Sequence, residues 1–292
     1  MTPGKRTLAC GSLASSLSLY ALAECLYTGA TFHWLDVEDA ARASTFIDSA
    51  RIEHLTSTPS LLDIMARRAA WGWESIETVV CGGAGVAPEQ RQRILVAAPA
   101  CTLFEYYGAS ELSLVTVKKT APGGSLEEDS VGTAFPGVDV QIRSSADGPD
   151  TVWVKTDTVC RGYFDGEVPL MHDNGWFTVG YQGTLDQLGR LRLRGRSSGM
   201  ILSAGLNVYP EEVETALSAV GLPGSCVVGR PHAVRGAQLV AVLPADVALG
   251  RSRHDLMDQL RLKLVPGAVP DCYMVMSRLP LLLGANWTAA AS

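Results

Sequence analysis

Short apolar runs alternate with segments of helical periodicity over the first 120 residues of the chain. Runs rich in β-branched and aromatic residues predict strands, and apolar residues spaced three and four positions apart predict helices. Pro88 marks one helix start, because the first helical turn tolerates proline. The expected strands are 31–35, 54–57, 78–81 and 102–106, and the expected helices are 37–49, 60–70 and 88–97. This alternation predicts an α/β fold.

The N-terminal stretch imitates a secretion signal, because Lys5 and Arg6 precede a mostly apolar segment that extends to residue 30. Serines dilute this segment, and Leu13, Leu17 and Tyr20 recur at helical spacing. We therefore expect a helix that buries one face rather than a cleaved leader. No segment reaches the roughly 18 uninterrupted apolar residues of a membrane span, so none is predicted.

The pattern of hydrophobic and polar positions changes twice along the chain. Beyond Pro122-Gly123-Gly124 the pattern becomes short β-rich pieces at 138–142, 151–155, 176–179 and 191–194, which predict a small antiparallel or barrel-like unit. Asp186 and Gly189 bracket a predicted hairpin turn, since Asp and Gly supply the side-chain bond and the permissive backbone that tight turns need. From residue 200 the pattern again predicts alternating strands and helices, with helices expected at 211–220 and 254–264 and strands at 225–229 and 239–243.

The amino-acid composition argues against several classes of function. The hydrophobic content of 47% is ample for a core, and a net charge of -6 argues against a nucleic-acid partner. The 7 cysteines are scattered without a paired motif, which indicates reduced, individually buried thiols and a cytoplasmic protein. The 5 histidines also stand apart, so no zinc site is predicted.

Two motifs carry candidate chemistry. An apolar run ends in Gly82-Gly83-Ala84-Gly85, where missing side chains would let a flat ligand approach the backbone, although a tight strand-to-helix turn has the same composition. The second motif is Tyr106-Tyr107-Gly108-Ala109-Ser110-Glu111. An aromatic face can stack on a purine, and a hydroxyl with a carboxylate can meet phosphate and Mg²⁺, yet a capped turn after a strand would look alike.

Further motifs follow these two in a fixed order. They are Asn174-Gly175-Trp176-Phe177, Gly189-Arg190-Leu191, Gly195-Arg196 and the run from Asn207 to Glu214. From about residue 8 to 286, this ordered set resembles the adenylate-forming superfamily of acyl-CoA synthetases, non-ribosomal adenylation domains and luciferases. The segment from Thr58 to Leu62 is similar to the family's acyl-pocket segment, and the run from Gly205 to Pro210 is similar to the CoA-ligase branch.

The resemblance implies a domain organisation. Residues 1–120 would be the acyl and nucleotide pocket part of a large α/β N-terminal domain, and residues 121–195 its small β-barrel-like part. Residues 196–199 would form a hinge, and residues 200–292 a small α+β C-terminal domain.

The resemblance also implies roles for the residues of the large domain. Gly82, Gly83 and Ala84 would border adenine and the acyl tunnel. Tyr107, with Gly108 beside it, would stack on the base. Ser110 and Glu111 would serve phosphate and Mg²⁺, with Glu111 as the metal ligand.

A second group of implied roles lies near the hinge. Tyr181 stands at the ribose-binding position, Arg196 would reach the ribose hydroxyls, and Gly199 stands at the hinge itself. The loop carrying Ala204 and Gly205 would form the pantetheine tunnel. The implied cofactors are therefore AMP or ATP with Mg²⁺, and coenzyme A or a phosphopantetheine thioester.

The chain departs from the family pattern at several of these positions. The family's phosphate loop would lie upstream of residue 8, so its backbone donors are not in this sequence. Tyr181 replaces an aspartate that accepts both ribose hydroxyls, and a phenol cannot supply that anionic acceptor. Gly199 replaces the usual Asp or Lys, and Asn286 aligns with a catalytic lysine whose charge it cannot offer. Together these changes predict impaired ATP-dependent adenylation.

Three hypotheses remain open at this point. The chain is an acyl-CoA-ligase-like enzyme that handles a small acyl substrate or its thioester, either alone or as the second half of a split ligase with a partner chain. Alternatively, it is a non-catalytic module that holds a nucleotide, an acyl group or a carrier-protein arm, or it is a truncated gene product. An apolar face left uncovered by the missing part would favour a homodimer or a partner chain.

Overall fold

The computed structural model describes residues 3–36, 40–69, 72–124, 130–145, 148–162, 171–196, 199–203, 206–232, 236–248 and 250–277. The chain divides into two compact units. The first unit comprises Met1–Val179 and Gly183–Leu193, and the second comprises Gly180–Gln182 and Arg194–Ser292. The finer division into four segments stays a prediction.

A seven-stranded sheet forms the frame of the first unit, with the strand order β2-β1-β3-β4-β5-β6-β7. Its first five strands pair in parallel, and β6 and β7 add antiparallel strands at one edge. The strands are β1 (Arg6–Cys10), β2 (Thr31–Leu35), β3 (His54–Ser57), β4 (Thr78–Gly82), β5 (Thr102–Ala109), β6 (Ser113–Thr120) and β7 (Thr133–Ala134).

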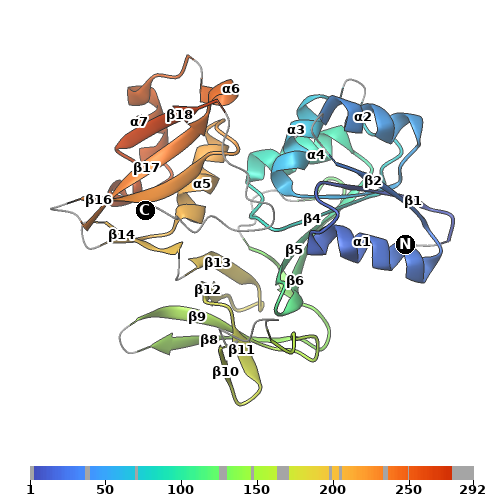
Figure 1. Cartoon of the computed structure of the whole chain (residues 1–292), viewed down its shortest axis with the longest axis horizontal. Helices are drawn as coiled ribbons and strands as arrows, with labels where there is room; N and C mark the ends of the chain where they lie inside the picture. The colour runs from blue at the N-terminus through green and yellow to red at the C-terminus, as the bar shows by residue number, and fades with distance from the viewer. Residues whose placement is uncertain are drawn as a thin grey trace. The chain divides into compact units, whose positions relative to one another are not determined.

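The helices of this unit divide between the two faces of the sheet (Figure 1). The helices are α1 (Ser16–Thr28), α2 (Ala40–Ser49), α3 (Pro59–Arg67) and α4 (Pro88–Ala97). The chain moves from β1 outward to β2, and every later parallel connection moves in the opposite direction. Because such crossovers are right-handed, α1 lies on one face, and α2, α3 and α4 lie on the other.

The main core lies between the sheet and the layer of α2, α3 and α4. Leu8, Leu55, Val79 and Leu103 stand in register across four strands and are each 0% exposed. Apolar residues of the three helices, including Ile47, Met65 and Ile94, pack against that row. The strands and helices predicted for this region are found where the pattern placed them, with shifts at their ends.

The prediction for the N-terminal stretch was wrong in two respects. Residues 6–10 form β1, an interior strand that was not predicted because this stretch is similar to a leader sequence. The helix exists as α1, but it buries Ser18, Ala21 and Cys25. Leu13 precedes the helix at 38% exposure, and Tyr20 is 40% exposed. The fully buried side chains of α1 are thus small, and Leu17 and Leu22 are half-buried.

A second, six-stranded sheet has β10-β11-β9-β12-β13 in order and β8 paired to β9. The predicted turn between β12 and β13 is confirmed, because the Gly189 N–H donates to the Asp186 carbonyl at 3.0 Å and Gly189 has φ +72°. Asp186 Oδ1 also accepts from the backbone N–H groups of Leu188 and Arg190. The strands are β8 (Asp139–Ser145), β9 (Gly148–Lys155), β10 (Met171–Asp173), β11 (Trp176–Thr178), β12 (Tyr181–Leu185) and β13 (Leu191–Arg196).

The second unit contains a five-stranded sheet with β15-β14-β17-β16 in order and β18 paired in parallel to β17. Its helices pack Val213, Leu217, Leu256 and Leu260 onto Leu239 and its neighbours. The elements are β14 (Ile201–Ser203), β15 (Leu206–Val208), α5 (Pro210–Ala219), β16 (Cys226–His232), β17 (Gly236–Pro244), α6 (Ala245–Ala248), α7 (Arg253–Arg261), the 3-10 helix η2 (Pro266–Ala268) and β18 (Cys272–Met276).

The cysteines and the helices answer two of the sequence expectations. All the cysteines are free thiols, but Cys160, Cys226 and Cys272 are only half-buried, so burial of every thiol was wrong. No helix in the described part of the chain is long and apolar enough to cross a membrane.

Candidate functional site

The candidate residues of the first unit gather where the parallel strands end. Strands β1, β3, β4 and β5 run in one direction, so their carboxyl ends share one edge of the sheet, which is where α/β sheets bind ligands. Ser57 Oγ donates to the Cys10 carbonyl at 2.9 Å and ties two of these ends together. Gly82 stands in register with Tyr106, so the glycine motif and the aromatic motif lie on adjacent strands.

The glycine motif is an open loop between β4 and α4. Gly82 is buried, and a Cβ at this position would lie 3.2 Å from the Tyr106 carbonyl oxygen, which is a tight contact that glycine avoids. Gly83 has φ +87°, and it is exposed together with Ala84 and Gly85. Added Cβ atoms at Gly83 and Gly85 would meet nothing within 4 Å. The loop therefore presents bare backbone to a ligand.

A buried ion pair behind this loop escaped the sequence analysis. Arg91 of α4 is 2% exposed and donates to both carboxylate oxygens of Glu105, at 2.7 and 3.0 Å. The same guanidinium donates to the Val86 carbonyl of the loop at 3.2 Å, and Lys118 Nζ lies 4.0 Å from Glu105. The alternation of β5 places Glu105 on the buried face, and a buried carboxylate requires a cationic partner, which was the available signal.

The buried thiol beside this pair has no role as a nucleophile. Cys81 is 0% exposed, and burial raises the pKa of its thiol well above the usual range, with the Glu105 carboxylate adding to the shift. Because the thiolate is the reactive form, Cys81 stays inert near neutral pH.

The aromatic motif forms the end of β5 and a tight turn into β6, three residues beyond the predicted strand end. Tyr107 is 6% exposed, so its ring faces the protein interior. A β-bulge follows at Gly108, where a Cβ would lie 2.2 Å from the Ser113 carbonyl oxygen. Only glycine fits this crossing of two backbones.

Ser110 and Glu111 lie in the turn that follows. The Leu112 N–H donates to the Ala109 carbonyl at 3.1 Å and closes the turn, which leaves the Ser110 hydroxyl exposed and Glu111 half-buried. The Glu111 carbonyl accepts from the Cys160 N–H at 2.7 Å, so the turn is anchored to the β-rich part of the same unit. A hydroxyl and a carboxylate at an anchored turn can contact phosphate or a hard cation.

In the second unit, Tyr181 and Arg196 form a pair. The Arg196 guanidinium lies over the Tyr181 ring, 4.8 Å from its centroid, and the backbone N–H of Arg196 donates to Glu211 at 3.4 Å. Its Nε atom is buried and has no hydrogen-bond partner in the structure. The ring quadrupole thus attracts the cation, but it offers no anionic oxygen to a ligand.

Neighbouring groups hold the strand that carries Arg196. Arg194 lies over the Tyr209 ring at 5.2 Å and bonds Glu212 at 3.2 Å, while the Tyr209 hydroxyl donates to Gln182. Gly199 is exposed. Gly205 and Asn286 lie outside the described residues.

Within the part of the chain that the structure describes, no cluster of His, Cys, Asp or Glu could by itself hold a metal ion.

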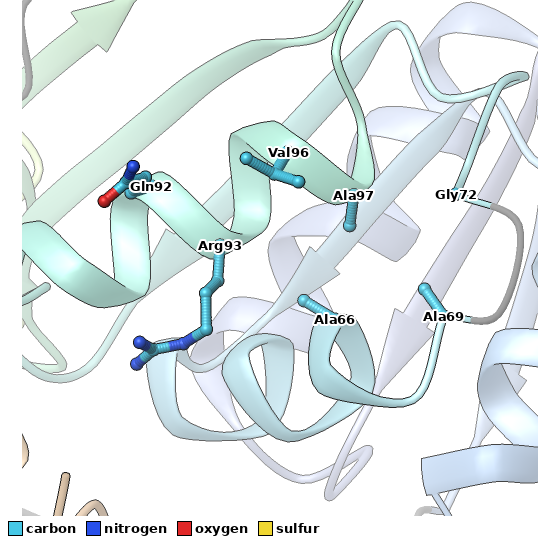
Figure 2. A pocket seen from close by; sticks show the side chains of 7 residues that line it. All are labelled: Ala66, Ala69, Gly72, Gln92, Arg93, Val96 and Ala97. Atoms are coloured by element: carbon cyan, nitrogen blue, oxygen red, sulfur yellow. The ribbon is translucent and has the colours of Figure 1, made fainter.

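A hollow of about 410 Å³ lies between α3 and α4, where Arg93 extends from α4 toward α3 (Figure 2). None of the predicted site residues lines it. Its lining residues are Ala66, Ala69, Gly72, Gln92, Arg93, Val96 and Ala97.

Comparison with known proteins identifies relatives of this chain. An uncharacterised acyl-CoA ligase of Bacillus subtilis, YhfT, is 30% identical over 278 residues, which cover 92% of this chain and 56% of YhfT. A 2-succinylbenzoate–CoA ligase of Staphylococcus aureus is 24% identical, over 90% of this chain and 53% of that enzyme. The chain thus spans about half the length of the curated relatives it matches.

Solved structures share the fold. The o-succinylbenzoate CoA synthetase MenE of Bacillus subtilis, solved with an acyl-adenylate intermediate, matches 96% of this chain and 59% of its own, with a TM-score of 0.79 at 24% identity. The amide bond synthetase McbA of Marinactinospora thermotolerans matches with a TM-score of 0.78 at 24% identity, over 95% of this chain and 58% of that one. A family profile for AMP-binding enzymes matches residues 1–164. Family profile, relatives and fold agree, and the chain belongs to the AMP-binding enzyme family of adenylate-forming proteins.

Proposed function

We propose that this chain is an acyl-CoA-ligase-like enzyme that handles an acyl group or acyl thioester, and that it adenylates poorly on its own. The single observation that carries the second part is the stacking of Arg196 on Tyr181 at 4.8 Å. A ribose diol is held best by an anionic oxygen that accepts from both hydroxyls, and a phenol ring cannot do this.

The residues of the first unit fit part of a nucleotide and acyl site. The backbone of Gly83 and Gly85 is open, and the Ser110 hydroxyl and Glu111 carboxylate lie on the turn after the adjacent strand. Glu111 would hold Mg²⁺, which would neutralise phosphate charge when bound. Tyr107 fits less well, because its ring is 6% exposed and gives little face for a base. Coenzyme A or a phosphopantetheine arm would supply the acceptor thiol, and Gly205 is the residue proposed beside it.

The first experiment tests adenylation directly. The full chain is incubated with ATP, Mg²⁺ and a panel of carboxylic acids, and pyrophosphate release is measured. Because the ribose acceptor is replaced and charge stabilisation is commonly worth a few kcal/mol in the transition state, we expect release near background. Turnover at rates ordinary for enzymes, about 1 per second or more, would refute impaired adenylation.

The second experiment tests the Tyr181 argument. Tyr181→Asp should strengthen AMP binding about tenfold or more in calorimetry, since charge-assisted hydrogen bonds contribute about 1.5–3 kcal/mol. Tyr181→Phe keeps the ring over Arg196 and is the matched control, so its AMP affinity should stay within about twofold of the original. Equal affinities for the Asp and Phe variants would remove the basis of the proposal.

A split ligase, in which a partner chain would supply the phosphate loop, is the second candidate. A chain that supplies the remaining part should then restore pyrophosphate release in a mixture. A non-catalytic binding module predicts that AMP, coenzyme A or acyl-CoA bind in calorimetry and that no mixture turns over. A cytoplasmic location also remains part of this proposal, supported by the free thiols.

A further inference from the structure

The tip of the glycine loop has no packing of its own. Gly83, Ala84 and Gly85 are exposed, and Cβ atoms added at the two glycines would meet nothing within 4 Å. Glycine has more conformational freedom than any other residue, so a loop of this composition does not hold one shape by itself. The shape that the loop presents to a ligand is therefore fixed from its ends.

One end of the loop is anchored by the first turn of α4. The Ala87 N–H donates to Gln90 Oε1 at 3.0 Å, and the Arg91 N–H donates to the Ala87 carbonyl at 3.0 Å. These two bonds fix where the helix begins, but they involve no atom before Ala87. The carbonyl of Val86 accepts instead from Arg91 Nη2 at 3.2 Å. The Arg91 side chain thus reaches past the start of the helix into the loop.

The same guanidinium holds β5. Arg91 Nε and Nη2 donate to the two carboxylate oxygens of Glu105 at 2.7 and 3.0 Å. Because Nη2 carries two hydrogens, it serves Glu105 and Val86 together. Glu105 stands in register with Cys81 of β4 and directly precedes Tyr106, where the aromatic motif begins. Arg91 therefore joins the glycine loop to the strand that carries the aromatic motif.

A contribution to core stability does not by itself account for this ion pair. Burying two charges costs desolvation energy, and apolar residues of similar volume often stabilise a fold equally well. Arg91 is 2% and Glu105 7% exposed, so this cost applies to both. Apolar residues lack direction, whereas a planar guanidinium with fixed donors sets the position of each acceptor. The pair thus supplies a defined geometry that apolar packing cannot.

We propose that Arg91 is a positioning residue that holds the exposed glycine loop in one conformation beside the end of β5, with Glu105 as its support. The inference deepens the proposed nucleotide and acyl site and rests on that function for its ligand. Without the contact to Val86, the loop samples several conformations. A ligand then has to order the loop on binding, which lowers its affinity.

Three variants separate this role from stability. Arg91→Lys keeps a cation for Glu105, but a compact ammonium lacks the planar fork that reaches Glu105 and Val86 together. Glu105→Gln keeps the size of the side chain and removes its charge, so it weakens the support of the guanidinium. Leu103→Ala opens a cavity in the core on the same strand and leaves the hydrogen bonds of the loop in place, so it is the control for lost stability.

Two measurements test the proposal. NMR relaxation gives the backbone order parameters of Gly83 to Gly85, which should fall from about 0.85 to below about 0.6 in Arg91→Lys. They should fall less in Glu105→Gln and stay high in Leu103→Ala. Calorimetry gives the affinity for AMP, which should weaken roughly tenfold in Arg91→Lys and stay within about twofold in Leu103→Ala.

Unchanged loop order in Arg91→Lys and Glu105→Gln would overturn the proposal, as would an equal loss of order in Leu103→Ala. Where AMP binds the unmodified chain, an unchanged AMP affinity of Arg91→Lys would overturn it as well. If the unmodified chain binds no AMP, the proposed nucleotide site fails, and the order parameters alone decide the role of Arg91.

Discussion

The two faces of the parallel sheet differ sharply, although the same strands make both. Leu55, Val79 and Leu103 are each 0% exposed beneath α2, α3 and α4, while their neighbours Val80 and Phe104 are half-buried on the opposite face. Both sets are apolar, as expected of strands that are covered on both sides. The face beneath α2, α3 and α4, here called the completed face, is thus more fully buried among the described residues than the opposite, open face.

The largest effect should come from the buried ion pair on the completed face. Glu105→Ala leaves the Arg91 guanidinium buried without its carboxylate, which should lower the free energy of unfolding by about 3–5 kcal/mol. Lys119→Ala on the open face should cost at most about 1 kcal/mol. Denaturant unfolding measures the free energy of unfolding of both variants, and hydrogen exchange of the β4 amides gives a local readout. Equal losses for the two variants would contradict the difference between the two faces.

Next in size is the comparison of adjacent residues on one strand. Leu103→Ala should lower the free energy of unfolding by about 2–5 kcal/mol, because it opens a cavity in a packed core. Phe104→Ala removes a larger side chain but should cost less, since water already reaches that position. Chemical denaturation measures the free energy of unfolding of the two variants. A greater loss for Phe104→Ala than for Leu103→Ala would show that the open face is already covered.

The packing of α1 gives a smaller effect with a matched pair. Ala21→Leu overfills the contact between α1 and the sheet and should destabilise the first unit by about 1–3 kcal/mol. Ala23→Leu adds the same atoms to the exposed side of the helix and should change stability by less than about 0.5 kcal/mol. Thermal unfolding of both variants would reveal a reversed helix face if the order were inverted.

The smallest effect concerns His54 of β3, which pairs with Thr7 of the adjacent strand β1. Burial lowers the pKa of its imidazole, the Lys5 ammonium adds to this shift, and the carboxylates of Glu77 and Glu53 oppose it. Because its folded pKa lies below the unfolded value, His54 contributes stability above about pH 6.5 that is lost as the pH falls through the lowered pKa.

NMR titration of the His54 ring measures this pKa, and His54→Asn should remove its part of the acid dependence.

Local pattern predicted most elements of the fold. The positions of β2, β3 and α4 follow from short-range periodicity and from Pro88 at a helix start. Strand β1 was missed because the five residues Arg6–Cys10 carry no local mark of an interior strand. Its place between β2 and β3 depends on pairing with segments more than twenty residues away.

The candidate site divides in the same way. The glycine loop and the turn with Ser110 and Glu111 could be placed at strand ends from the sequence, because parallel strands present these ends at one edge. The contacts of Arg91 with Glu105 and of Arg196 with Tyr181 join distant positions, and no spacing rule connects them. The roles assigned to the site residues stay predictions.

By itself, the sequence determined many of the strands and helices, the hairpin turn at Asp186 and Gly189, and the family motifs, because backbone preferences and side-chain periodicity act over a few residues. Only the tertiary structure decided which face of α1 is buried and which side of the sheet is complete. Those outcomes depend on how the helix packs on the strands, with Ala21 buried, and on the handedness of the crossovers, which places α1 on the face opposite to the other described helices of the first unit.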